Sequence, residues 1–193
     1  MSRVAIPSWN SHGVLPPNDL GNPTSRKRSP YTVSSMDFVS RFGTTPERLS
    51  ILDGFLSFRL ELYGTNLIRG FQWVDGSFCE DIESLESRPP KDIDVVTFFC
   101  LPNNYTQETF LKAYSQLFNH DFNKNNYHVD AYFVDLNGGA SEFLINNSAY
   151  WYSLWSHRRD ARWKGYLRID LSQVDDHAAR ENLNQMMAGE GMQ

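Results

Sequence analysis

The chain has 193 residues, a length typical of a single domain. Hydrophobic residues make up 40% of it and aromatic residues 14%, which provides enough apolar material for a core and excludes global disorder. The net charge of -5 excludes a uniformly basic nucleic-acid-binding protein, so a nucleic-acid partner would require a local basic patch.

Residues 1–43 are predicted to form an extended, Pro-rich arm that packs on the domain. Five prolines interrupt any regular element in its first part: Pro7, Pro16, Pro17, Pro23 and Pro30. Four apolar side chains can anchor the arm: Ile6, Trp9, Val14 and Leu15. The basic triplet at 26–28 is either a solvated charge run or a nucleic-acid contact.

A core is predicted over residues 44–136. Thr45 is a suitable helix cap, and Pro46 fits the first turn of the helix that follows. The near-continuous apolar run at 93–99 is typical of a strand buried on both faces. In order, we predict a helix, a strand, a loop, a strand, a helix and a strand, over residues 44–64, 68–74, 83–91, 93–99, 104–118 and 127–136.

Residues 137–193 are predicted to be a C-terminal extension of helices and a strand. It contains a turn, an aromatic helix and a short strand, over residues 137–139, 141–156 and 164–171. The polar end from Ala178 is either frayed or a terminal helix. The whole order predicts an α+β (α/β) protein with a small mixed central sheet flanked by helices.

Three aspartates carry the main chemical signal. Residues i and i+2 of a strand point to one face, so Asp92 and Asp94 are predicted to project together. Side-by-side carboxylates repel one another, and a divalent cation removes that repulsion. Asp130, on the later predicted strand, can complete a two-metal site. The alternative for Asp130 is an ion pair with a base such as His128 or an arginine.

A small-residue turn, Gly76-Ser77, follows the first predicted strand. Glycine allows the backbone to approach a phosphate closely, and serine adds a hydroxyl donor. The spacer between this turn and Asp92 is acidic, which is unfavourable beside a triphosphate unless the spacer folds outward. Its acidic residues are Glu80, Asp81, Glu83 and Glu86.

The pattern of Gly-Ser, a spacer, Asp-x-Asp and a later strand Asp resembles the DNA polymerase beta-like nucleotidyltransferase superfamily. It is most similar to the small prokaryotic members, the minimal nucleotidyltransferases of toxin–antitoxin and phage-defence operons. The resemblance covers about half the chain, from Thr45 to Leu136. The segments Trp-Val-Asp-Gly-Ser-Phe and Pro-Lys-Asp-Ile-Asp-Val-Val also resemble an uncharacterised nucleotidyltransferase-like branch that shares the N-terminal arm.

The resemblance implies a nucleotidyltransferase fold and assigns roles within it. Gly76 and Ser77 would contact the nucleotide phosphates. Asp92, Asp94 and Asp130 would bind Mg²⁺ or Mn²⁺, and Asp130 would help to activate the acceptor. The implied reaction transfers a nucleoside monophosphate, AMP from ATP, to a hydroxyl of a protein (AMPylation) or of a tRNA. A toxin or antitoxin protein is the implied partner, and a homo-oligomer is left open.

A basic cluster lies at residues 157–164. Its members can meet a triphosphate or an RNA acceptor, and Lys164 is the best single candidate for nucleotide binding. The alternative is a solvated helix end, where basic residues interact favourably with the helix dipole. The aromatic run 150–152, with Trp155, is interpreted as core or interface in preference to a base-stacking platform.

Two other functions stay open. The first is a catalytically inactive interaction module, such as an antitoxin or adaptor, although binding alone does not need three converging carboxylates. The second is a metal-dependent phosphodiesterase or nuclease, which the same carboxylates would support. The Gly-Ser turn favours transfer over hydrolysis.

The sequence also predicts a cytoplasmic protein without a membrane partner. Its two cysteines, Cys79 and Cys100, have no metal-like spacing and are interpreted as reduced thiols. No segment reaches the roughly 20 apolar residues that span a bilayer. Residues 1–17 lack the apolar run of a secretory signal.

Overall fold

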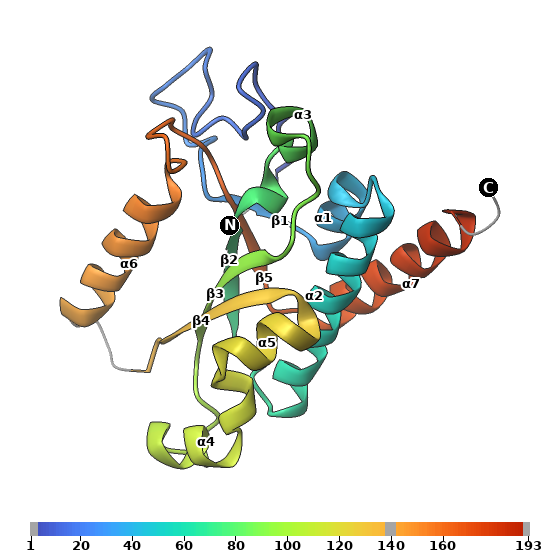
Figure 1. Ribbon diagram of the computed structural model, residues 1–193. Helices are drawn as coiled ribbons and strands as arrows, with labels where there is room; N and C mark the ends of the chain where they lie inside the picture. Colours follow the sequence, from blue (N-terminus) through green and yellow to red (C-terminus); the bar gives the residue numbers. More distant parts are fainter. Residues whose placement is uncertain (1–3, 138–141, 191–193) are drawn as a thin grey trace.

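The computed structural model describes residues 4–137 and 142–190 and has a five-stranded mixed sheet with helices on both faces (Figure 1). Its elements, in chain order, are β1 (Tyr31–Val33), α1 (Ser35–Phe42), α2 (Pro46–Gly64), β2 (Gly70–Asp75), the 3₁₀ helix η1 (Ser77–Cys79), α3 (Ile82–Glu86), β3 (Ile93–Phe99), α4 (Gln107–Ala113), the 3₁₀ helix η2 (Ser115–Phe118), α5 (His120–Tyr127), β4 (Val129–Asp135), α6 (Glu142–Trp155), β5 (Leu167–Asp170) and α7 (Gln173–Glu190).

The strand order is β1-β5-β2-β3-β4. The outer pairs, β1 with β5 and β3 with β4, are parallel, whereas β2 runs antiparallel to both of its neighbours. This confirms the predicted mixed α/β class. β1 comes from the predicted arm and β5 from the predicted C-terminal extension, so residues on both sides of the 43/44 and 136/137 boundaries build one sheet with the predicted core.

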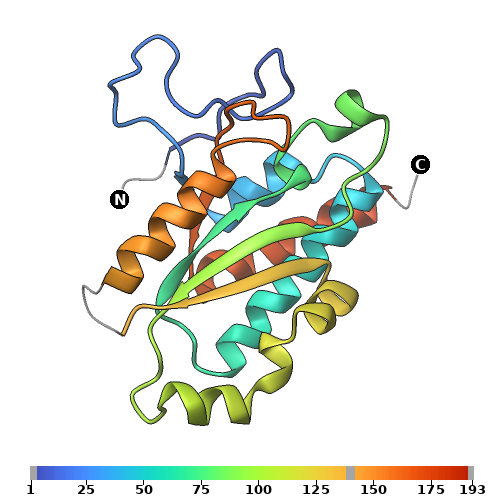
Figure 2. The ribbon, with the colours of Figure 1, turned by 60° about the vertical axis from the view of Figure 1, so that its left-hand side comes forward.

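Side-chain alternation along the strands separates two apolar clusters. Val95, Val129 and their neighbours join α1, α2 and α7 in the larger cluster. Val96 and Phe98 point to the opposite face and pack with α6 through Trp151 and Trp155. Figure 2 shows α6 alone on its side of the sheet, opposite α2 and α7.

The predicted start of α2 is confirmed. Thr45 accepts a hydrogen bond from the backbone of Arg48, and Pro46 begins the helix, as expected for a residue without an N–H to satisfy. The helix ends at Gly64, with Thr65 as its C-terminal cap. β3 has the predicted bounds, 93–99, and all of its residues except Asp94 are buried.

Several local elements differ from the prediction. β1 and α1 lie within the predicted arm, and α3 overlaps the first part of the predicted loop 83–91. The predicted helix 104–118 is divided into α4 and η2, and a further helix, α5, begins after Asn119, whose side chain accepts from the Phe122 backbone. The polar sequence of α5 contains no apolar repeat that would indicate a helix.

In the C-terminal part, α6 and β5 lie within their predicted ranges, and α7 forms the terminal helix that was one of two alternatives. Gly138 and Gly139 of the predicted turn 137–139 lie outside the described residues. α7 is attached to α2 by a buried ion pair: Arg59 Nε donates to Asp176 Oδ2 at 2.6 Å.

The arm covers the upper end of the sheet (Figure 1). Val14 and Leu15 are fully buried, and the Leu15 carbonyl accepts a hydrogen bond from the Gly165 backbone at 2.7 Å. The Trp9 indole donates to the Cys79 carbonyl at 2.8 Å. The arm therefore contacts both the segment after β2 and the segment before β5.

Candidate functional site

Three aspartates form a row across adjacent strands at one edge of the sheet. Asp75 is paired in register with Asp94, and Asp94 with Asp130. The end of β2 meets the beginnings of β3 and β4 because β2 runs antiparallel to β3. Directly paired residues point to one face, so all three side chains lie on the face that α6 covers.

A cleft of about 760 Å³ opens over this row. It contains every site residue that the sequence predicted: Gly76, Ser77, Asp92, Asp94, Asp130 and Lys164. Asp75, whose involvement was not predicted, also lines it. The cleft walls come from the segment after β2, the segment before β3, α5, and the hairpin-like segment 156–164, in which the Lys164 backbone donates to the Ser156 carbonyl.

Asp94 is the central acid of the row. Burial, followed by the charges of Asp75, Asp130 and Asp92, raises its pKa to about 7. Among the described residues, no ion pair involves Asp94. One of its carboxylate oxygens lies so close to Gly76 that a Cβ added to this glycine would be 2.3 Å from it. Gly76 has φ of +88°, which also favours glycine, so the turn requires this residue on two grounds.

Asp92 and Asp130 are contacted by α5. Lys124 Nζ lies 2.7 Å from Asp92 Oδ2 and 3.6 Å from Asp130 Oδ2. His120 Nδ1 lies 3.0 Å from Asp130 Oδ1. The alternative partner suggested for Asp130, His128, is instead the left-handed cap of α5. Sequence reasoning missed Lys124 and His120 because it did not predict their helix.

Lys164 is buried at the floor of the cleft, only 5% exposed, and is held by two carboxylates. Its Nζ lies 2.9 Å from Asp75 Oδ2 and 3.0 Å from Glu80 Oε1. These two acids, and hydrogen bonds to them, raise the pKa of Lys164 against the effect of burial. The ammonium is therefore committed to protein carboxylates rather than free to neutralise phosphates.

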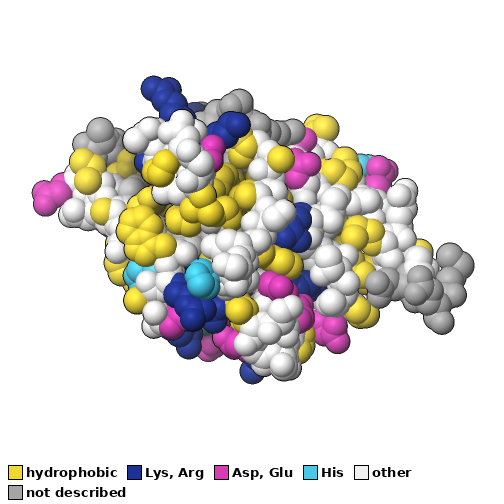
Figure 3. Space-filling view, turned by 90° about the horizontal axis from the view of Figure 1, so that it is seen from above, with side chains coloured by type: hydrophobic (Ala, Val, Ile, Leu, Met, Phe, Trp, Pro, Cys, Tyr) yellow, Lys and Arg dark blue, Asp and Glu magenta, His cyan; other side chains and the backbone are white. Residues whose placement is uncertain are grey.

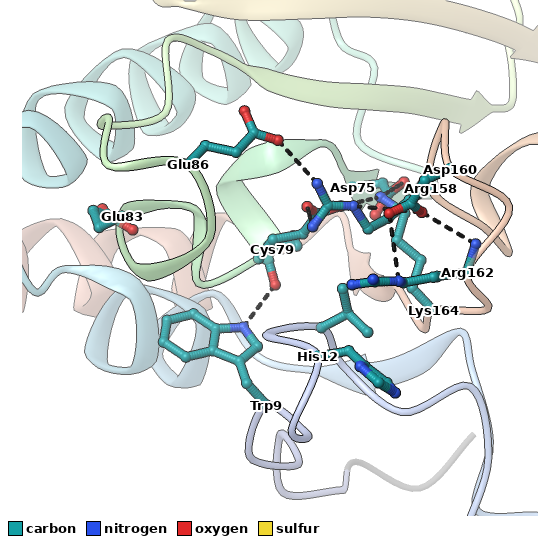
Figure 4. A network of polar contacts seen from close by, with 12 residues as sticks. Trp9, His12, Asp75, Cys79, Glu83, Glu86, Arg158, Asp160, Arg162 and Lys164 are labelled. Carbon is teal, nitrogen blue, oxygen red and sulfur yellow. Dashed lines mark hydrogen bonds and ion pairs between the residues drawn. The ribbon is translucent and has the colours of Figure 1, made fainter.

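Three of the four acidic residues of the spacer, Glu80, Glu83 and Glu86, form ion pairs with basic residues from distant elements (Figure 4). Arg158 contacts both Glu80 and Glu86, at 3.2 and 2.9 Å. Glu83 faces away from the cleft and pairs with the fully buried Arg48 at 2.6 Å. The spacer thus joins α2 to the segment before β5, which explains how an acidic loop is accommodated here.

The remaining aromatic and basic residues divide between core and surface. Trp151 and Trp155 are buried against Tyr132 and Tyr166, respectively, so their interpretation as core is confirmed. Trp163 is 69% exposed at the end of the 156–164 segment. On the face seen in Figure 3, basic and acidic side chains lie beside one another rather than in one broad basic region of the described surface.

Among the described residues, no group of three or more His, Cys, Asp or Glu side chains is placed so that it could hold a metal ion. The donor chemistry nevertheless fits a hard divalent cation, because Asp92, Asp94 and Asp130 offer only carboxylate oxygens. A cationic group already lies between two of them, the ammonium of Lys124. The carboxylates thus accept positive charge at the position where the sequence predicted a metal.

The raised pKa of Asp94 predicts a pH-dependent stability. The ordinary value of 3.8 applies to the unfolded chain, so between about pH 4 and pH 7 the folded state binds more protons. We expect the contribution of Asp94 to the free energy of unfolding of the metal-free protein to fall by about 1.4 kcal/mol for each unit by which the pH rises across this window. Burial also raises the pKa of Asp75, to about 6, which acts in the same direction.

This expectation is checked by urea unfolding with EDTA at pH 5, 6, 7 and 8. In Asp94→Asn this side chain is uncharged at every pH. The free energy of unfolding of the variant should therefore change less with pH than that of the wild type. Equal slopes for the two proteins would contradict the raised pKa of Asp94.

Fold and site together define a mixed α/β protein with a carboxylate-lined cleft at one edge of its sheet. Residues 7–170 match a family described as a family of unknown function, DUF6932, and the chain belongs to this family. No curated protein and no solved structure matches the chain. None of the described helices is both long and apolar enough to cross a membrane.

Proposed function

We propose that this protein is a metal-dependent nucleotidyltransferase that transfers AMP from ATP to an acceptor hydroxyl and releases pyrophosphate. One observation carries the proposal: Asp94 and Asp130, in register on adjacent parallel strands, share a cleft with Asp92 and with the Gly76-Ser77 turn. The order of strand, Gly-Ser turn, antiparallel strand with Asp-x-Asp, and parallel strand with Asp supports the resemblance to the polymerase beta-like superfamily.

In this proposal, Asp92, Asp94 and Asp130 hold Mg²⁺ or Mn²⁺. The bound metal neutralises triphosphate charge and lowers the pKa of the acceptor hydroxyl. Asp130 orients the acceptor, and Gly76 and Ser77 lie beside the phosphates. Transfer of this kind depends mainly on positioning and on neutralisation of charge.

The proposed role of Lys164 differs from the sequence-based prediction. Because two buried carboxylates hold its ammonium, Lys164 supports Asp75 and the cleft wall. Arg159 and Lys91 line the same cleft, and neither forms an ion pair within the described residues. We assign contacts with the triphosphate to these two exposed residues.

The acceptor, a protein or a tRNA, and a role in toxin–antitoxin or phage-defence systems rest on the resemblance. A cytoplasmic location rests on the interpretation of Cys79 and Cys100 as reduced thiols. An interaction module is the second candidate, and one observation favours it. α6 exposes several large apolar side chains on the two flanks of its buried face, and exposed apolar side chains are typical of a binding surface: Phe143, Ile145, Tyr150, Tyr152 and Leu154.

Transfer is tested by incubating the protein with Mg²⁺, each α-labelled nucleoside triphosphate, and either tRNA or co-expressed proteins. We expect label on an acceptor with the wild type and none with Asp92→Ala/Asp94→Ala. Asp135→Ala, at the other end of β4, is the matched control and should retain transfer. Equal labelling by the wild type and the double variant would exclude the proposed site.

Two other outcomes support the alternatives. Release of nucleotide fragments without a labelled acceptor would indicate hydrolysis. Stable partner binding by the wild type and the double variant alike, without labelling by either, would indicate an interaction module.

A further inference from the structure

The carboxylate row is contacted by two side chains from one face of α5. His120 and Lys124 are four residues apart, so they lie one helical turn from each other on the same side of the helix. His120 contacts Asp130, and Lys124 lies between Asp92 and Asp130. α5 is followed directly by β4 after a single left-handed residue, His128, which places this face next to the carboxylates.

Lys124 differs from Lys164, the buried lysine of the cleft, in its freedom to move. Lys164 is buried beneath the row, whereas the side chain of Lys124 is 44% exposed. A long, half-exposed lysine side chain gains little from an ion pair because ordering the chain costs entropy and water screens the charges. Lys124 can therefore leave the carboxylates without disturbing the core.

The position of the Lys124 ammonium coincides with the position expected for a divalent cation. It bridges Asp92, which precedes β3, and Asp130, which lies in β4, and these are two of the three proposed metal ligands. An ammonium and a divalent ion about 4 Å apart repel strongly, so the two cannot occupy this position together.

We propose that Lys124 is an internal counter-ion of the site, which occupies the cation position in the metal-free protein and must swing out before a divalent cation binds. This inference rests on the proposed function only in expecting that these carboxylates bind a divalent cation. Displacement releases Asp92 and Asp130, and the cation also gains Asp94, which has no ion pair of its own within the described residues. Lys124 thus lowers the affinity for metal and stabilises the metal-free fold.

The inference is tested by measuring Mn²⁺ binding through the loss of the free-ion signal in electron paramagnetic resonance. Neither nucleotide nor acceptor is needed. We expect Lys124→Met to bind Mn²⁺ about tenfold more tightly than the wild type, since the competing charge is gone. Lys124→Arg should remain close to the wild type. Lys112→Met is the matched control, because Lys112 is an exposed lysine of α4 that does not line the cleft.

Thermal unfolding gives a second readout of the competition between the Lys124 ammonium and a divalent cation. Without metal, Lys124→Met should unfold at a lower temperature than the wild type, because Asp92 and Asp130 lose the ammonium that lies between them. With saturating Mn²⁺ this difference should disappear or reverse. A loss of stability of equal size with and without Mn²⁺ would indicate a purely structural lysine and overturn the inference.

Three other results would also overturn the inference: equal Mn²⁺ affinity in the wild type and Lys124→Met, weaker Mn²⁺ binding by the variant, or no Mn²⁺ binding by either protein. These outcomes differ from a failure of the proposed function. If Lys124→Met binds Mn²⁺ more tightly but no acceptor is labelled by any variant, nucleotidyl transfer is excluded and the internal counter-ion stands.

Discussion

Replacement of Gly76 by alanine is expected to reduce the proposed nucleotidyl transfer by about a hundredfold or more, because it displaces the central carboxylate of the site. An added Cβ would lie 2.3 Å from Asp94 Oδ2, and the turn holds Gly76 at φ of +88°. Asp94 belongs to a central strand with neighbours on both sides, so the side chain rather than the backbone must give way. A displacement of about 1 Å at a reacting centre can cost about a hundredfold in rate.

The measurement compares transfer rates and Mn²⁺ affinity for Gly76→Ala with those for Gly64→Ala. Gly64 is the exposed last residue of α2, and a Cβ there meets no atom within 4 Å, so its replacement should leave both quantities unchanged. Unchanged transfer and metal binding in Gly76→Ala would contradict the tight contact between Gly76 and Asp94. Circular dichroism of each variant identifies any loss of transfer that results from unfolding.

Arg59→Met is expected to destabilise the fold by about 3–5 kcal/mol, the cost of removing one partner from a buried ion pair. The Arg59 guanidinium is fully buried in α2 and donates to Asp176 of α7 and to the Gln72 side chain of β2, in both cases at 2.6 Å. Asp176 also accepts hydrogen bonds from Tyr63 and Ser35. Loss of Arg59 leaves an uncompensated carboxylate between two helices and the sheet.

Urea unfolding of a double-mutant cycle checks this expectation. Arg59→Met/Asp176→Leu should cost less than the sum of the two single substitutions, because neither charge is left alone. Arg88→Met is the control: Arg88 pairs with Glu86 at the surface, so its loss should cost less than about 1 kcal/mol. Additive costs in the cycle would show that Arg59 and Asp176 act independently.

Local signals in the sequence were sufficient for the elements with strong patterns. The Thr45 cap with Pro46 located the start of α2, and the apolar run located β3, because both signals are contained within a few residues. β1 has only three residues and depends on pairing with β5, more than 130 positions later. α5 is polar, and packing between α2 and β4 stabilises it rather than an apolar repeat.

Asp92, Asp94 and Asp130 were predictable as site residues from the sequence, whereas the contacts of the basic residues were not. Alternation along a strand placed Asp92 and Asp94 together, whereas the alignment of Asp75 with Asp94 depends on the register between β2 and β3. Lys164 was identified as a candidate for nucleotide binding, but its partners Asp75 and Glu80 could not be predicted because they lie more than 80 positions earlier. Lys124 was not predicted as a site residue because its helix, α5, was not predicted.

The position of β5 between β1 and β2 has a consequence for synthesis of the protein. A growing chain that has emerged from the ribosome as far as Leu136 already contains all four aspartates, yet β2 lacks one neighbour and Asp75 lacks Lys164. Until residue 170 is available, the half-formed sheet exposes an open strand edge that other chains can pair with. We therefore expect this strand edge to need protection from other chains late in translation, and the cleft to be complete only when β5 has been inserted.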